Sequence, residues 1–213
     1  MHHIMFDIDG TLVQSCDFDE HCYIAAIKEV TGHTLNGDWS TYPQVTDSGV
    51  LLHFLQQIGL QDKFTEIHQQ VKTLFTEKIA DHLQQTPLTE VPGAATFINY
   101  LRDQQQVRLS LATGGWNETA RLKLAAAGID ITGIPLASSN DHYARTEIMQ
   151  LALQQACENR TPSSLSYFGD GEWDRRACSE LNFNFILVGN RTCHHQQISD
   201  FSDLQQALTF LPL

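Results

Sequence analysis

Two aspartates, Asp7 and Asp9, stand near the start of the chain where a buried strand is expected to end. The apolar residues around 4–8 are typical of a parallel strand, and Gly10 follows at the turn. Because the chain leaves the sheet here, both carboxylates can converge at the carboxyl end of the strand. Carboxylates this close repel each other unless a cation joins them, and Mg2+ fits if a phosphate supplies further oxygens. The alternative is a polar turn, since Asp and Gly are common turn residues.

A second segment, residues 113–117, has the composition of a phosphate-binding turn. It follows an expected strand at residues 107–112 and begins with Thr113, Gly114 and Gly115, and a helix is expected after it. At such a helix start, backbone N–H groups and the helix dipole point at an anion, and the Thr113 hydroxyl adds a further donor. Taken alone the segment is a weak signal, because many turns between a strand and a helix contain two glycines.

A cation and two further carboxylates follow later strands. Arg145 is expected to begin a helix after a short strand around residues 134–137, and its guanidinium offers a planar fork to phosphate or carboxylate. Asp170 and Asp174 follow an expected strand at residues 165–168, and both could turn toward a metal held by the first aspartates. The alternatives are an exposed arginine in the first turn of a helix, and aspartates that only cap one.

These segments together resemble a known family. Residues 6–12 look like the first signature of the haloacid dehalogenase (HAD) superfamily, whose members are mostly phosphatases. The segments at Thr113, at Arg145, and at Asp170 with Asp174 resemble the other three signatures in the same order. Arg145 departs from the commoner form of the third signature, because most members of the family have Lys at this point. The resemblance implies an α/β fold: a Rossmann-like parallel-sheet core with helices on both faces, plus an inserted helical cap.

The resemblance also implies the catalytic and metal-binding roles of the four aspartates. Asp7 would be the nucleophile that forms an aspartyl-phosphate, and Asp9 would protonate the leaving oxygen and then activate water. Mg2+ would be the cofactor. It would bind Asp7, the backbone carbonyl of Asp9, and Asp170. Asp174 would either bind the ion directly or contact a group that does.

The same resemblance assigns the phosphate-binding groups. Thr113, the backbone of Gly114, and Arg145 would hold the phosphoryl oxygens.

The stretch between the first two signatures is expected to be a helical insert. Helical spacing of apolar residues recurs at about 19–30, 46–59 and 62–83, and no strand pattern appears before residue 92. We therefore expect core segments at 1–14 and 90–213 and a helical cap at 15–89. A terminal helix is expected over residues 198–210. His2 and His3 are interpreted as preceding the first strand.

The cap's composition limits the substrate. Its acidic residues outnumber its basic ones, which are all lysines. This disfavours polyanionic substrates such as nucleoside triphosphates, and the resemblance favours phosphoglycolate or another small monoester. Asp47 and Ser48, at the expected start of a cap helix, are interpreted as helix caps, with a position facing the site as the alternative.

Composition excludes several classes of protein. The net charge of −12 argues against nucleic acid as a partner, and no apolar run is long enough to span a membrane. The five cysteines show no Cys-x-x-Cys spacing, which favours reduced thiols. We expect a cytoplasmic monomer or homodimer that acts on a small phosphorylated metabolite.

The function predicted from these observations is a Mg2+-dependent phosphatase. A phosphomutase of the same superfamily is the main alternative, because it would keep all four signatures and transfer the phosphoryl group to a hydroxyl instead of water. A dehalogenase is disfavoured by Asp9, and a receiver-type signalling module by the helical insert. A non-catalytic phosphate-binding protein is disfavoured because Asp7, Asp9 and Asp170 are all present.

Overall fold

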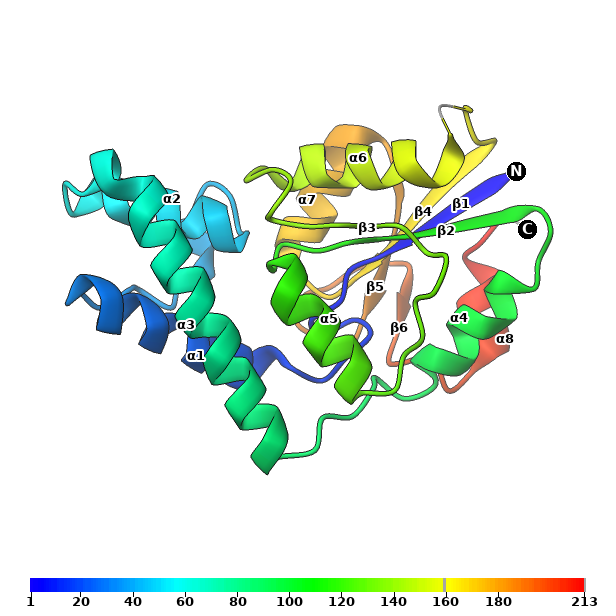
Figure 1. Cartoon of the computed structure of the whole chain (residues 1–213). Coiled ribbons are helices and arrows are strands. Elements are labelled where there is room, and N and C mark those ends of the chain that lie inside the picture. The colour runs from blue at the N-terminus through cyan, green and yellow to red at the C-terminus, as the bar shows by residue number, and fades with distance from the viewer. Residues whose placement is uncertain (159, 213) are drawn as a thin grey trace.

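The computed structural model describes residues 1–158 and 160–212 of the chain. Within these residues the centre of the fold is a six-stranded parallel sheet in the order β3-β2-β1-β4-β5-β6 (Figure 1). Because β1 lies between β2 and β4, the strand order reverses there, and this is where ligand sites form in such sheets. The strands are β1 (His2–Phe6), β2 (Val107–Ala112), β3 (Leu136–Ala137), β4 (Ser164–Gly169), β5 (Asn184–Val188) and β6 (Gln197–Ile198).

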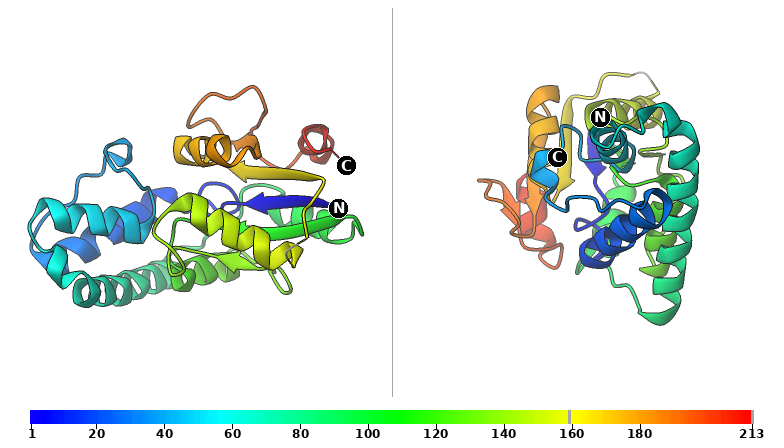
Figure 2. Two further views of the ribbon diagram at one scale, coloured as in Figure 1. Left: turned by 90° about the horizontal axis from the view of Figure 1, so that it is seen from above. Right: turned by 90° about the vertical axis from the view of Figure 1, so that its left-hand side faces the viewer.

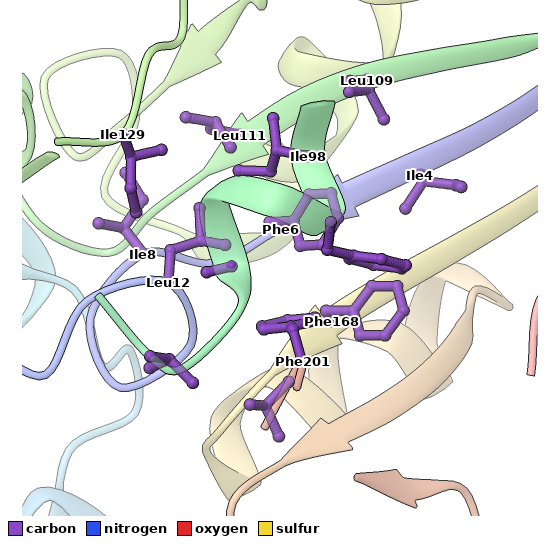
Figure 3. Close-up of a cluster of buried hydrophobic side chains, with 14 of the residues drawn as sticks. Ile4, Phe6, Ile8, Leu12, Ile98, Leu109, Leu111, Ile129, Phe168 and Phe201 are labelled. Carbon is purple, nitrogen blue, oxygen red and sulfur yellow. The ribbon is translucent and has the colours of Figure 1, made fainter. Parts of the chain in front are cut away.

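Helices cover both faces of the sheet, as predicted. One face packs against α4 (Ala94–Arg102), α5 (Asn117–Ala126) and α8 (Leu204–Thr209), and the other against α6 (Arg145–Cys157) and α7 (Glu172–Leu181). Side chains of β1 alternate between the faces, so Phe6 stacks on Phe168 in the first layer (Figure 3) and Met5 lies in the second. A strand buried on both faces is apolar without interruption, which explains the run that begins at Ile4.

The helical insert packs beside one end of the sheet (Figures 1 and 2). It contains α1 (Cys16–Thr31), α2 (Asp47–Gln57) and α3 (Phe64–Gln85), with short 3-10 turns at η1 (Trp39–Thr41) and η2 (Gln61–Lys63). Its apolar core also takes in Trp116, a fully buried residue from the turn after β2, so the insert is anchored on the sheet domain. None of the helices in the described part of the chain is long and apolar enough to cross a membrane.

Two predictions about secondary structure are wrong. Ile198 does not begin the terminal helix: it pairs with Val188 in β6, and α8 starts only at Leu204, after Asp203 has capped it. His2 and His3 lie inside β1, where the neighbouring strands provide hydroxyl partners for their rings. The Nδ1 atom of His2 is 2.6 Å from Ser164 Oγ, and the Nε2 atom of His3 is 2.9 Å from Ser110 Oγ.

Candidate active site

The predicted site residues gather at the carboxyl edge of the sheet. Asp7, Thr113 and Asp170 directly follow β1, β2 and β4, the three neighbouring strands at the point where the order reverses. A cavity of about 120 Å³ opens at this edge. Its lining includes six of the seven predicted residues, namely Asp7, Asp9, Thr113, Gly114, Arg145 and Asp170. The seventh, Asp174, contacts Arg145 behind this lining.

Three buried carboxylates form the acidic part of the site. One oxygen from each of Asp7, Asp170 and Asp174 lies within 4.8 Å of the other two, and the side chains are almost inaccessible to solvent. Burial and then the charge of Asp174 raise the pKa of Asp7 well above its usual value, and the same two causes raise the pKa of Asp170 to about 7. Asp7 Oδ1 has no hydrogen-bond partner among the described residues. A group of this composition suits a hard divalent cation.

Asp174 is held by protein donors on both carboxylate oxygens. Its Oδ1 accepts from Arg145 Nη1 at 2.8 Å and from the Tyr167 hydroxyl at 3.0 Å, and its Oδ2 accepts from the Gly171 N–H at 3.0 Å. The last bond joins Asp174, in the first turn of α7, to Gly171, which precedes the helix. Asp174 therefore supports both the start of α7 and the guanidinium of Arg145.

Arg145 connects the acidic group to the helical insert. It is the first residue of α6 and only 7% exposed, so the alternative of an exposed first-turn arginine is wrong. Its Nη1 lies 3.6 Å from Asp7 Oδ1, and its Nη2 donates to the Val45 carbonyl of the insert at 3.1 Å. Burial alone would lower the pKa of the guanidinium, but the charges of Asp174 and Asp7 outweigh it and raise that pKa.

The turn after β2 contacts the insert, and the sequence did not indicate this contact. Thr113 Oγ1 accepts from the Gly115 N–H at 3.0 Å. The Trp116 N–H, at the start of α5, donates to Asp47 Oδ2 at 2.8 Å, so a carboxylate of the insert already occupies that helix end. Thr113 and Gly114 are thus the groups of this turn that can meet a phosphate.

Asp47 and Ser48 do not cap α2 as predicted. Thr46 is the cap, because its hydroxyl accepts from the Gly49 N–H at 3.0 Å. Asp47 lines the cavity, and Ser48 is buried, where its hydroxyl accepts from the Trp116 indole N–H at 2.9 Å. Of these two residues, only Asp47 faces the site.

Sequence reasoning missed Lys123 and Asp19, which meet beside Asp9. Lys123 in α5 has no exposed surface, and its Nζ lies 2.5 Å from both Asp9 Oδ1 and Asp19 Oδ1. Burial raises the pKa of Asp19 to about 6, an effect that the charge of Lys123 opposes. Helical spacing was the available signal, because Lys123 lies on the face that Ala120 and Leu124 bury.

Comparisons with known proteins identify a family and similar folds. A family model described as haloacid dehalogenase-like hydrolase matches residues 1–182. The fold is similar to that of a hydrolase from Pseudomonas syringae, at 18% identity and a TM-score of 0.71, with 98% of each chain covered. It is also similar to CbbY from Rhodobacter sphaeroides in complex with phosphate, at 17% identity and a TM-score of 0.74, with 99% of each chain covered.

A third similar structure is a proposed β-phosphoglucomutase from Bacteroides vulgatus, at 14% identity and a TM-score of 0.69, covering 100% of this chain and 91% of that one. No curated protein sequence matches the chain. At these identities the structural likeness establishes the fold, while the family model, which spans most of the chain, establishes the family. The chain belongs to the haloacid dehalogenase-like hydrolases.

Proposed function

We propose that this hydrolase is a Mg2+-dependent phosphatase of small phosphate monoesters. The observation that supports it best is the convergence of Asp7, Asp9, Thr113, Arg145 and Asp170 on one small cavity from separate parts of the chain. The cavity pairs an acidic group suited to a cation with donors suited to a phosphoryl group. Both are needed to bring a phosphate dianion against a carboxylate nucleophile.

The reaction would proceed in two transfers. In the first, a carboxylate oxygen of Asp7 attacks phosphorus, the bond from phosphorus to the ester oxygen breaks, and the carboxyl group of Asp9 gives its proton to that oxygen. In the second, the Asp9 carboxylate takes a proton from water, whose oxygen attacks phosphorus and releases inorganic phosphate from Asp7. Thr113, the Gly114 backbone and Arg145 would hold the phosphoryl oxygens throughout.

The residues present fit a bound Mg2+ ion. Asp7 has a buried oxygen without a partner among the described residues, and Asp170 lies within reach of the same point. Asp174 has both oxygens bonded to protein donors, which favours its position behind Asp7 and Asp170 as a support for them. When bound, the ion would offset the repulsion between the carboxylates and the phosphate.

The lining contributed by the insert limits the leaving group. Asp19, Glu20 and Asp47 bring carboxylates to the cavity, and Tyr23 and Trp39 bring aromatic rings, whereas none of the lining residues from the insert is a lysine or an arginine. The cations of the lining, Arg145 and Arg191, each lie against a carboxylate of the sheet domain. An uncharged or cationic alcohol therefore suits the site better than an anionic one such as glycolate.

The same lining favours hydrolysis over phosphoryl transfer between sugar phosphates. A mutase holds a second phosphate at the far end of its substrate, and that phosphate needs its own cationic partner. The carboxylates of the insert would repel it.

Phosphate release from p-nitrophenyl phosphate tests the proposal. We expect release with Mg2+, none with a chelator, and none from Asp7→Asn in either condition. Asp103→Asn, which changes an exposed aspartate just after α4, is the matched control and should keep wild-type activity. Release that continues in chelator, or in Asp7→Asn, would refute the assigned cofactor or the nucleophile respectively.

A further inference from the structure

A buried lysine links the sheet domain, the insert and Asp9. Lys123 Nζ lies 2.5 Å from Asp9 Oδ1, in the loop after β1, and 2.5 Å from Asp19 Oδ1, in the first turns of α1. The Ser15 hydroxyl donates to the same oxygen of Asp9. The carboxylates of Asp9 and Asp19 are 20% exposed toward the cavity, whereas Lys123 is fully enclosed.

Stability alone does not account for a lysine at this position. Its neighbours on the buried face of α5 are Ala120 and Leu124, and an apolar side chain of similar length would fill the same space. Replacing a buried ion pair by apolar groups is often neutral or stabilising, so a buried pair needs another reason to be present. Here the carboxylate that receives the charge belongs to the residue proposed to move protons.

We propose that Lys123 is a positioning residue, which fixes the Asp9 carboxylate for proton transfer and, through Asp19, makes that placement depend on α1 being docked. This inference rests on the proposed function, because it takes Asp9 as the acid and base. One fixed oxygen restricts rotation of the Asp9 side chain and leaves the other oxygen to face the ester. If α1 moved away, Lys123 would keep one carboxylate partner and lose the other.

The chain provides a control contact between the insert and the sheet domain. Lys72 of α3 pairs with Glu118 of α5 at 2.9 Å, as Lys123 pairs with Asp19, but neither residue lines the cavity or touches Asp9. Lys72→Met therefore removes a contact at the surface between the insert and the sheet domain and leaves the contacts of Lys123 with Asp9 and Asp19 in place. Any effect that Lys123→Met has and Lys72→Met lacks is specific to the buried lysine.

Comparing esters with different leaving groups distinguishes a positioning role of Lys123 from a merely structural one. p-Nitrophenolate departs readily without a proton, whereas an alkoxide needs one from Asp9. We therefore compare kcat/KM, which reports steps up to formation of the aspartyl-phosphate, for p-nitrophenyl phosphate and for the alkyl ester that the wild type hydrolyses best. General acid catalysis contributes about 10²- to 10⁴-fold, so Lys123→Met should lower the alkyl value at least about tenfold more than the aryl value.

The other variants define the outcome. Asp9→Asn should show the same preference for the aryl ester, Lys123→Arg should recover part of the alkyl activity, and Lys72→Met should leave the ratio unchanged. Equal losses for both esters in Lys123→Met, in a protein with wild-type circular dichroism, would overturn the positioning role. Asp19→Asn keeps the contact between Lys123 and Asp9, and its ratio should lie between those of wild type and Lys123→Met.

A readout without turnover tests the link to α1. Amide hydrogen exchange in the first turns of α1 should speed up in Lys123→Met and in Asp19→Asn, because both variants remove the ion pair between Lys123 and Asp19. Exchange there should not change in Lys72→Met. Unchanged exchange would overturn the link. An inactive wild type would instead overturn the proposed function and the proton-transfer role of Lys123, while hydrogen exchange would still decide whether Lys123 holds α1.

Discussion

Replacing Arg145 by methionine should destabilise the protein because it strands a buried charge. Asp174 has no exposed surface, and Arg145 Nη1 at 2.8 Å is its nearest cationic partner. Removing one member of a buried ion pair costs about 3–5 kcal/mol. Two donors would remain, the Tyr167 hydroxyl and the Gly171 N–H at 3.0 Å each, so we expect Arg145→Met to lie near the lower end of that range.

Removing the charge of Asp174 as well should return part of the stability. In Arg145→Met with Asp174→Asn, the amide still accepts from one of the donors and position 174 no longer carries a buried charge without a cationic partner. The two changes should therefore cost less together than the sum of the separate changes, by about 1–3 kcal/mol, as is usual for residues in contact. Activity should be lost in the single Arg145 variant and stay lost in the double variant, because the phosphate then lacks its guanidinium.

Urea unfolding followed by tryptophan fluorescence measures both quantities. The buffer should contain a chelator, because a metal that binds only the folded state would add stability to some variants and not to others. Arg102→Met is the matched control: Arg102 pairs with Asp130 at 3.2 Å on the surface, and its loss should cost less than about 1 kcal/mol. Additive effects within about 0.5 kcal/mol would refute the reasoning, since they would show that Asp174 does not depend on Arg145.

Three further predictions concern other parts of the molecule. Gly114→Ala would place a Cβ 2.5 Å from Arg145 Nη2 and 2.9 Å from the Val45 carbonyl, so unfolding in urea should show a loss of about 1–3 kcal/mol, and KM should rise. Burial lowers the pKa of His3 from 6.5 to about 4. As the pH falls from 6.5 to about 4, the unfolded state therefore binds a proton that the folded state does not, and the folded state loses stability. At pH 5 the wild type should have lost about 2 kcal/mol more of its pH 7 stability than His3→Gln, and equal losses would refute this. In a panel of phosphoethanolamine, glycerol 1-phosphate and phosphoglycolate, kcat/KM should be lowest for phosphoglycolate, and the reverse order would contradict the role given to the acidic lining.

The sequence predicts which residues meet at the carboxyl edge of the sheet, because a parallel sheet leaves little freedom there. Carboxyl ends of neighbouring strands meet at one edge, so an apolar run followed by polar residues locates Asp7, Thr113 and Asp170 without knowledge of packing. The strand at residues 107–112 and the helix starting at Arg145 have the predicted bounds. Local pattern was sufficient for each of these.

What the sequence did not predict depends on how separate elements dock. Asp19 and Asp47 reach the cavity because the insert packs around Trp116. The spacing of apolar residues in the insert does not indicate how the insert is oriented on the sheet domain. Lys123 is hard to identify because its position on an apolar helix face conflicts with its charge until Asp9 and Asp19 supply partners. Ile198 was assigned to a helix because a two-residue strand has no period to detect, and its pairing with Val188 is a long-range contact.

Nearby cations compensate the three buried carboxylates at the carboxyl edge of the sheet unequally, and this affects what the candidate site can bind. Arg145 lies 2.8 Å from Asp174 but 3.6 Å from Asp7, and Arg191, which is 45% exposed, lies 3.5 Å from Asp170. Asp7 is therefore the least compensated carboxylate of the three. A phosphate dianion alone would be repelled there, whereas a dianion together with a divalent cation adds no net charge. For the proposed phosphatase, this arrangement of charges would favour joint binding of cation and ester, and the carboxylates of the insert would disfavour a further negative charge on the leaving group.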